Sequence, residues 1–198
     1  HLSVHSFPTR RSSDLSLGFR GEALAAIADA ARLELTTNDG GAAGTRVVVD
    51  GTKTAGDDGG SIEASDAGRA RGTTVVVEDL FATRPARRES LAGPAAEFAR
   101  VSALVADYAL ANPQVAFALA HDGSTTLSTP GTGVTDALFG VYDRETASRS
   151  TELAASVGVG TGEGGSETAS VGVAGALAYP SVTRASRDHV RVSVNGRP

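Results

Sequence analysis

The sequence contains no cysteine, no methionine and no tryptophan, and only 5% of its 198 residues are aromatic. Without cysteine there can be neither a disulfide nor a thiolate metal site. The four histidines are scattered without the spacing of a ligand cluster. No apolar run is long enough to cross a bilayer, and no basic segment leads into an apolar one as in a secretory signal. We therefore expect a cytoplasmic protein with no membrane partner and no metal-ligating residues.

Lysine is almost absent as well, because Lys53 is the only one and every other base is arginine. The formal net charge is −5. An acidic surface suits a salt-rich cytoplasm, where self-repulsion is screened, so a haloarchaeal source fits this composition, as does codon bias in a GC-rich bacterium. The acidity argues against one broad basic face for nucleic acid. Any DNA contact would have to come from local clusters of arginine.

Hydrophobic residues make up 40% of the chain, which is enough for a core, and their periodicity indicates a mixed α/β protein. The pattern predicts helices over 22–31, 94–111 and 134–142, and strands over 32–37, 44–50, 72–80, 115–121, 124–129, 152–159, 170–178 and 190–194. Turn residues at 38–41 and 122–123 predict two hairpins. Three successive valines, Val75 to Val77, predict a strand buried on both faces in the middle of a sheet.

The remaining segments are rich in glycine and polar residues. Residues 51–71 predict a surface loop with room for one short strand, and 160–169 a mobile connection. Pro85 is suited to the first turn of a helix or to a turn. The break between Leu80 and Pro94 separates two α/β units.

The first fifteen residues, HLSVHSFPTRRSSDL, have no periodicity and none of the composition that follows. Residues 7–15 resemble the translation of a common sequencing adapter. We expect 1–15 to be such an artefact and disordered, the alternative being a genuine arm whose two adjacent arginines contact nucleic acid.

The most informative stretch is Gly18-Phe19-Arg20-Gly21-Glu22-Ala23-Leu24, in which two glycines three apart open into a helical run. Such a junction presents free backbone N–H groups and the positive end of a helix dipole, which suits a phosphate group. The same turn also occurs in α/β domains that bind no ligand. The whole segment 16–28, SLGFRGEALAAIA, resembles the ATP-lid motif of the MutL family of DNA mismatch repair proteins, members of the gyrase, Hsp90, histidine kinase and MutL (GHKL) ATPase superfamily.

A second block supports the resemblance. The string GTTVVVEDLF at 72–81, followed by PARR at 85–88, is similar to the family's Gly-Thr before a central strand and its Pro-Ala-Arg junction. A Gly-Thr at a strand edge lets backbone and hydroxyl approach a nucleotide closely, which makes Thr73 a candidate contact, although an ordinary strand start looks the same. Residues 82–84, Ala-Thr-Arg, stand where the family more often has an aromatic residue, Asn and Thr, and Glu89-Ser90 replaces a basic-aromatic pair.

Weaker similarities continue in order to the end of the chain, at 112–123, 179–187 and 194–198. The resemblance implies a fold of the α/β (α+β) class: the C-terminal part of a GHKL-type ATPase sandwich over 16–88, then a ribosomal protein S5 domain 2-like transducer domain over 89–198, truncated at its C-terminus. It also implies that Gly18, Phe19, Arg20, Gly21, Glu22 and Thr73 contact the nucleotide. Arg20 could face phosphate or pair with Glu22 or Asp29, and Glu22 is better suited to a first-turn role than to that of general base.

The function that the resemblance implies is that of a DNA mismatch repair ATPase. The parent would bind ATP and Mg²⁺, dimerise on ATP binding, bind DNA, and couple mismatch recognition by a MutS-like protein to strand processing. The family's catalytic Glu and Asn and its Asp-Gly-x-Gly precede the lid, and its transducer Lys follows the Asn-Gly-Arg segment. We therefore expect this fragment to have no catalytic residues and not to hydrolyse ATP.

Candidate DNA contacts are arginines at the junction and in the C-terminal part: Arg87, Arg88, Arg187 and Arg197. More often such side chains are solvated or pair with local acids. Two other functions remain open, an ATPase and transducer piece of a type II topoisomerase-like protein and a non-enzymatic α/β interaction domain.

Overall fold

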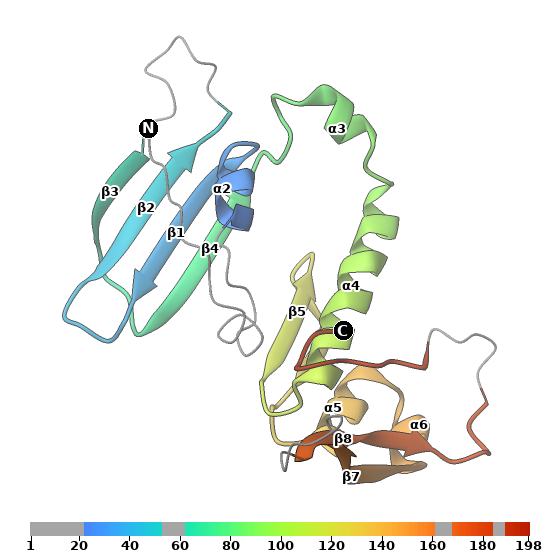
Figure 1. The fold of residues 1–198 in the computed structure, drawn as a ribbon. Helices are drawn as coiled ribbons and strands as arrows, with labels where there is room; N and C mark the ends of the chain where they lie inside the picture. The colour runs from blue at the N-terminus through green and yellow to red at the C-terminus, as the bar shows by residue number, and fades with distance from the viewer. Residues whose placement is uncertain (1–21, 53–61, 161–167, 184–188) are drawn as a thin grey trace. The chain divides into compact units, whose positions relative to one another are not determined.

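The computed structural model describes residues 22–52, 62–160, 168–183 and 189–198 (Figure 1). Two compact units divide the chain, the first ending at Pro94 and the second beginning at Ala95. Each unit is a mixture of helices and antiparallel strands. The predicted domain limits of 16–88 and 89–198 stay a prediction.

The first unit is built on a four-stranded antiparallel sheet in the order β3-β2-β1-β4 (Figure 1). Its elements, in chain order, are α2 (Glu22–Ala28), β1 (Arg32–Asn38), β2 (Gly44–Asp50), β3 (Ile62–Ala67), β4 (Gly72–Glu78) and α3 (Pro85–Glu89). Asn38 closes the β1–β2 hairpin, because its side-chain amide donates to the carbonyls of Gly41 and Arg69 while its Oδ1 accepts from the N–H of Gly40. The predicted hairpin is confirmed, and β3 is the short strand for which the 51–71 segment had room.

Alternation along the strands gives the sheet two chemically different faces. Leu35 of β1 lies opposite Val47 of β2 and Val75 of β4, so these side chains share an apolar face. Glu34 and Arg46 occupy the opposite face, where the guanidinium donates to both carboxylate oxygens at 2.8 and 2.6 Å. The core of this unit lies at the end of α2 and the start of β1, where Ala30, Ala31 and Leu33 are buried.

The prediction that Val75 to Val77 are buried in the middle of a sheet is wrong for the described part of the chain. In this part β4 pairs only with β1 and forms one edge of the sheet, and the three valines are 44, 40 and 41% exposed. Three valines in succession record only a preference for strand and for burial; they do not say which strands lie next to them. The strand also ends earlier than predicted, at Glu78, because Asp79 has a φ of +54°.

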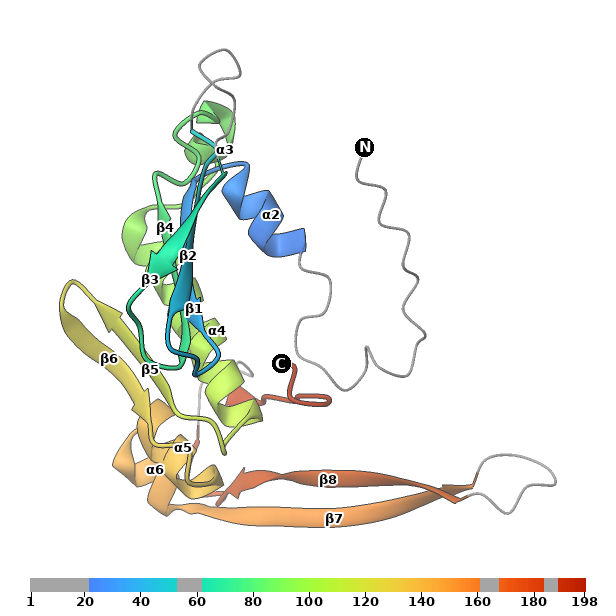
Figure 2. The same ribbon diagram turned by 90° about the vertical axis from the view of Figure 1, so that its left-hand side faces the viewer.

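The second unit begins with the long helix α4 (Pro94–Ala111) and carries two separate hairpins. Its other elements are β5 (Phe117–His121), β6 (Ser124–Thr129), α5 (Val134–Val141), α6 (Arg144–Ser148), β7 (Ser150–Gly160) and β8 (Thr168–Ala178). Asp122 and Gly123 turn β5 into β6 with φ values of +48° and +76°, as a two-residue turn of this sequence requires. Figure 2 shows β7 and β8 as a long two-stranded ribbon.

Small residues dominate the core of this unit, where Ala106 and Ala109 of α4, Ala137 of α5 and Ala147 of α6 are buried. The helix at 144–148 has no counterpart in the sequence prediction. Its Asp143 N-cap accepts a hydrogen bond from the N–H of Thr146 at 2.6 Å, which satisfies one of the free donors of the first turn.

The predicted strand at 190–194 is also wrong. Its valines are largely exposed, and the only pairing there is an isolated bridge between Val194 and Arg197 across a tight turn. Asn195 and Gly196 at the tip have φ values of +52° and +74°. The chain therefore reverses direction directly after Val194, the residue at which the predicted strand ended. Most of the predicted mobile connection at 160–169 lies outside the described residues. In the described part of the chain, no helix is both long and apolar enough to cross a membrane.

Candidate functional site

The predicted nucleotide loop falls mostly outside the described part of the chain, which begins at Glu22. Gly18, Phe19, Arg20 and Gly21 therefore stay predictions. Glu22 is the first residue of α2 and is exposed, in the first turn where a negative charge is favourable to the helix dipole. The helix ends at Ala28, three residues earlier than predicted.

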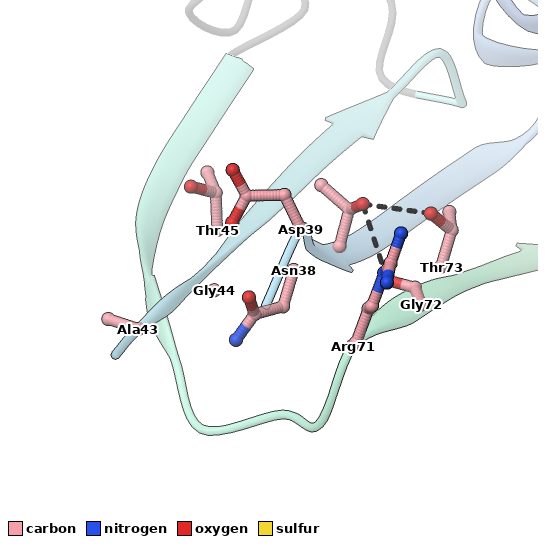
Figure 3. Close-up of a pocket in the computed structure, with 9 residues that line it drawn as sticks. Asn38, Asp39, Ala43, Gly44, Thr45, Arg71, Gly72 and Thr73 are labelled. Carbon is pink, nitrogen blue, oxygen red and sulfur yellow. Dashed lines mark hydrogen bonds between the residues drawn. The ribbon is translucent and has the colours of Figure 1, made fainter. Parts of the chain in front are cut away.

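Thr73 lies near the start of β4, directly opposite Thr37 of β1. The two hydroxyl oxygens are 2.8 Å apart, a normal length for a hydrogen bond between hydroxyls. Thr37 also donates to the carbonyl of Gly72 at a longer 3.4 Å. Both contacts are drawn in Figure 3. The structure therefore fixes the position of the Thr73 hydroxyl through a partner that the sequence analysis did not identify.

The threonine pair lines an open hollow of about 550 Å³ at one end of the sheet (Figure 3). The described residues around it come from the β1–β2 turn and from the start of β4, and they are Thr37, Asn38, Asp39, Ala43, Gly44, Thr45, Arg71, Gly72 and Thr73. Among them Arg71 is the one cation and Asp39 the one carboxylate. The hollow thus offers hydroxyls and one guanidinium to a polar ligand.

Glycines permit the close backbone packing at this end of the sheet. A Cβ on Gly44 would lie 2.7 Å from the carbonyl oxygen of Thr37. Gly72 has a φ of +138°, which side-chain-bearing residues rarely adopt, and it precedes Thr73 directly. The glycine therefore allows the backbone to turn into β4 where Thr73 meets Thr37, and a nucleotide contact by Thr73 stays a prediction.

The opposite face of the sheet is held by ion pairs. The hydrogen-bonded guanidinium of Arg46 lowers the pKa of Glu34 below its ordinary 4.5, with smaller Coulombic contributions from Arg46 and Arg32. The guanidinium of Arg32 pairs with Glu78 at 2.6 Å. These contacts connect neighbouring strands and pair the carboxylates of Glu34 and Glu78 with arginines.

The predicted DNA-contacting arginines fall in different places. Arg87 and Arg88 are exposed on the short α3, where the guanidinium carbon of Arg87 lies 6.0 Å from the centre of the Phe81 ring. Arg197 belongs to the second unit and bonds Val194 through its backbone. Arg187 lies outside the described residues. The structure brings Arg87 and Arg88 together on one helix, and DNA contact by the four arginines stays a prediction.

Residues that sequence reasoning missed surround Thr73. Thr37, Asn38 and Arg71 carry no motif, and their proximity depends on β1 pairing with β4 across more than thirty residues. The register of the β1–β2 hairpin could be predicted from its turn, but nothing in the periodicity places β4 beside β1. Within the described residues, no group of acids and histidines could hold a metal ion.

Comparison with known proteins decides the family. No family model matches the chain. The DNA mismatch repair protein MutL of Halobacterium salinarum is 42% identical over 206 aligned residues, covering 99% of this chain. The chain belongs to the MutL family. MutL of Geobacillus kaustophilus is 36% identical over 92% of the chain, and MutL of Methanoculleus marisnigri is 36% identical over 99%.

The match covers only part of each MutL relative, since the chain spans 29, 26 and 32% of the lengths of these three proteins. The similarity to the MutL of Halobacterium salinarum fits the haloarchaeal source that the acidic composition suggested.

Solved structures agree with this assignment. The Aquifex aeolicus MutL ATPase domain complexed with ADP matches 69% of this chain and 52% of its own, with a TM-score of 0.57 and 28% identity. The N-terminal domain of a DNA repair protein matches 73% of the chain with a TM-score of 0.57 at 24% identity, which supports the fold alone. The α/β fold of a MutL GHKL ATPase domain is therefore shown, whereas the S5 domain 2-like identity of the second unit stays a prediction.

Proposed function

We propose that this chain is the part of a MutL-like DNA mismatch repair ATPase that supplies the lid and one edge contact of the nucleotide site. The observation that carries the proposal is the likeness to the Aquifex aeolicus MutL ATPase domain, whose structure was solved with ADP. The loop Gly18–Glu22 would meet the phosphates through its backbone N–H groups. Thr73 would contact the nucleotide through its hydroxyl.

The local chemistry around Thr73 supports this role. A hydroxyl offers one donor and two acceptor positions, and the pairing with Thr37 uses one of these positions while it fixes the side chain. The adjacent hollow is open to solvent and has the guanidinium of Arg71 on its rim. A polar ligand such as a nucleotide would thus meet an ordered hydroxyl beside a positive charge.

Hydrolysis requires more than these contacts. Bound Mg²⁺ would neutralise charge on the phosphates and help to position an attacking water. The described residues contain no group of acids that could hold it. We assign no hydrolytic step to this chain, and we place ATP turnover, Mg²⁺ and ATP-driven homodimerisation in the parent protein.

The second unit would transmit the nucleotide state to the rest of the parent as an S5 domain 2-like transducer. DNA would be contacted by the local arginines Arg87, Arg88, Arg187 and Arg197, and a MutS-like mismatch recognition protein would be the upstream partner.

The MutL relatives favour this function over a topoisomerase-like one. The second unit has two hairpins and three helices among its described residues, enough for a folded domain of its own.

Equilibrium binding of a fluorescent ADP analogue to the 198-residue chain tests the proposal. We expect saturable binding that unlabelled ATP and ADP displace and that Gly21→Asp abolishes, because a carboxylate in the lid loop would repel phosphate. Gly93→Asp is the matched control, because it adds the same charge at a glycine where a Cβ meets nothing within 4 Å. Absence of saturable binding, or equal binding by Gly21→Asp, would refute a nucleotide site formed by this chain.

A further inference from the structure

The carboxyl end of α2 is held in an unusual way. Three successive carbonyls after the helix accept hydrogen bonds from two other segments of the first unit. Asp29 accepts from the guanidinium of Arg84 at 3.1 Å and Ala30 from the N–H of Phe81 at 2.8 Å, both after β4, and Ala31 accepts from the N–H of Gly51 at 3.1 Å. These residues follow Ala28, the last residue of α2, and their carbonyls are satisfied by other segments of the unit.

Arg84 makes the one side-chain contact among these three. The same Nη2 atom that donates to the Asp29 carbonyl also bonds the Asp29 carboxylate. The last turn of α2 contains no basic residue of its own. A carboxylate at this end of a helix is unfavourable to the dipole, and a cation is favourable. Arg84 supplies the missing cation and neutralises the acid.

Arg84 is also the N-cap residue of α3, yet its side chain makes no capping bond to that helix. Pro85 follows at the first helical position, and the N–H groups of Arg87 and Arg88 bond the Arg84 carbonyl. The backbone of Arg84 thus belongs to the start of α3, while its side chain belongs to the end of α2. The two helices share this residue.

The turn before Arg84 is built to bring it there. Asp79 and Phe81 have φ values of +54° and +63°, which are costly for residues with side chains. This backbone directs the Phe81 N–H at Ala30 and its carbonyl at the Arg84 N–H, 3.0 Å away.

We propose that Arg84 is a positioning residue that couples α2 to α3, so that a change at the end of α2 alters the order of the helix that begins after Arg84. Only the expected effect of ADP on the two helices rests on the proposed function. The contact itself does not depend on a ligand. It predicts that a substitution on either helix alters the order of the other.

Hydrogen exchange of the full chain, read by mass spectrometry on millisecond to second timescales, tests the coupling without nucleotide. Arg84→Met should speed exchange in α2 about threefold to tenfold, the range expected for an exposed ion pair that also serves a helix end. Asp29→Asn should speed exchange in α3, although residue 29 is outside that helix. Arg84→Lys should restore most of the protection, because it keeps the cation.

The double variant sharpens the test. Asp29→Asn in the Arg84→Met background should slow exchange in α2 again, because it removes the uncompensated carboxylate from the helix end. Arg32→Met is the matched control: its side chain is 32% exposed against 34% for Arg84, and it pairs with Glu78, but backbone bonds already join those strands. Arg32→Met should leave hydrogen exchange in both helices unchanged. Exchange in β2 should be the same in every variant.

Addition of ADP separates the two proposals. In the wild-type chain ADP should protect both helices, and in Arg84→Met it should protect α2 alone. If ADP protects neither helix while the substitutions still act across them, the nucleotide proposal fails for this chain and the coupling stands. If Arg84→Met leaves α2 unchanged, or Asp29→Asn leaves α3 unchanged, the coupling is overturned whatever ADP does.

Discussion

At the scale of single residues, the hydroxyl pair of Thr37 and Thr73 makes the sharpest prediction about ligand binding. Thr73→Val should weaken nucleotide binding about fivefold to twelvefold, because it removes one hydrogen bond of about 1–1.5 kcal/mol from the contact. Thr37→Val should weaken binding less, since it leaves Thr73 in place but frees its rotation. Titration with a fluorescent ADP analogue measures both.

Thr37→Ser is the control for this pair, because it keeps the hydroxyl that contacts Thr73 at 2.8 Å. It should bind as the wild type does. Equal affinity in Thr73→Val and the wild-type chain would show that the hydroxyl does not touch the ligand.

Gly51 makes a prediction about stability at the same scale. A Cβ at this position would lie 2.1 Å from the carbonyl oxygen of Ala28, a contact with backbone that no side-chain motion can relieve. Gly51→Ala should therefore destabilise the first unit by about 1–3 kcal/mol. Denaturant unfolding followed by circular dichroism measures the change. Gly68→Ala, where a Cβ meets nothing within 4 Å, should unfold close to the wild-type midpoint.

At the scale of elements, the ion pair between β1 and β2 gives the sheet a pH dependence. The pKa of Glu34 lies below its ordinary 4.5 because Arg46 binds the ionised carboxylate. Because the pKa of Glu34 is lower in the folded state, its ion pair stabilises the fold fully at a pH above the pKa of the unfolded state. This stabilisation is lost as the pH falls through the pKa of the folded state. The wild-type advantage over Glu34→Gln should thus be constant above about pH 5 and shrink below pH 4.5.

Thermal melts of the two proteins from pH 7 to pH 3 measure this difference. Glu63→Gln, on the edge strand β3, is the comparison, and its difference from the wild type should be smaller at every pH. A gap between wild type and Glu34→Gln that stays constant down to pH 3 would contradict the assigned cause.

The elements also show what the sequence could and could not reveal. The β1–β2 and β5–β6 hairpins were predictable because their turns need the residues that stand there, Asn38 and Gly40 in one and Asp122-Gly123 in the other. The helix over 94–111 was predictable from its apolar spacing and from the proline at each end. The five-residue α6 was missed, since one turn of helix has no periodicity.

Strand order and strand environment were beyond the sequence pattern. The three valines of β4 indicate a strand correctly, but burial depends on which neighbours the tertiary fold supplies, and the described residues supply one. The same limit applies to the candidate site. Thr73 was found through its resemblance to a motif, whereas Thr37 becomes its partner only through long-range pairing.

At the scale of the whole molecule, the net charge of −5 predicts a dependence on salt. The Debye length falls from about 10 Å at 0.1 M to about 3 Å at 1 M, so self-repulsion between the acidic groups is screened as salt rises. The melting temperature should therefore rise with KCl, by several degrees over this range, despite some loss from exposed ion pairs. Calorimetry at a series of KCl concentrations measures the rise.

The double variant Glu63→Gln/Asp66→Asn changes the formal net charge from −5 to −3, and both substitutions lie on the exposed strand β3. Its melting temperature should depend less steeply on KCl. A steeper dependence, or a fall in melting temperature with salt in the wild type, would show that local ion pairs outweigh the overall repulsion.

The exposed edge of β4 has a practical consequence for handling the protein. Residues 73–77 form an unbroken run of β-branched residues without charge or proline, and their outer backbone groups have no strand partner in the described part of the chain. Such an edge recruits identical strands from other molecules and seeds aggregates. A high protein concentration favours this association. Val76→Lys should block it, because it places a charge on the exposed edge strand.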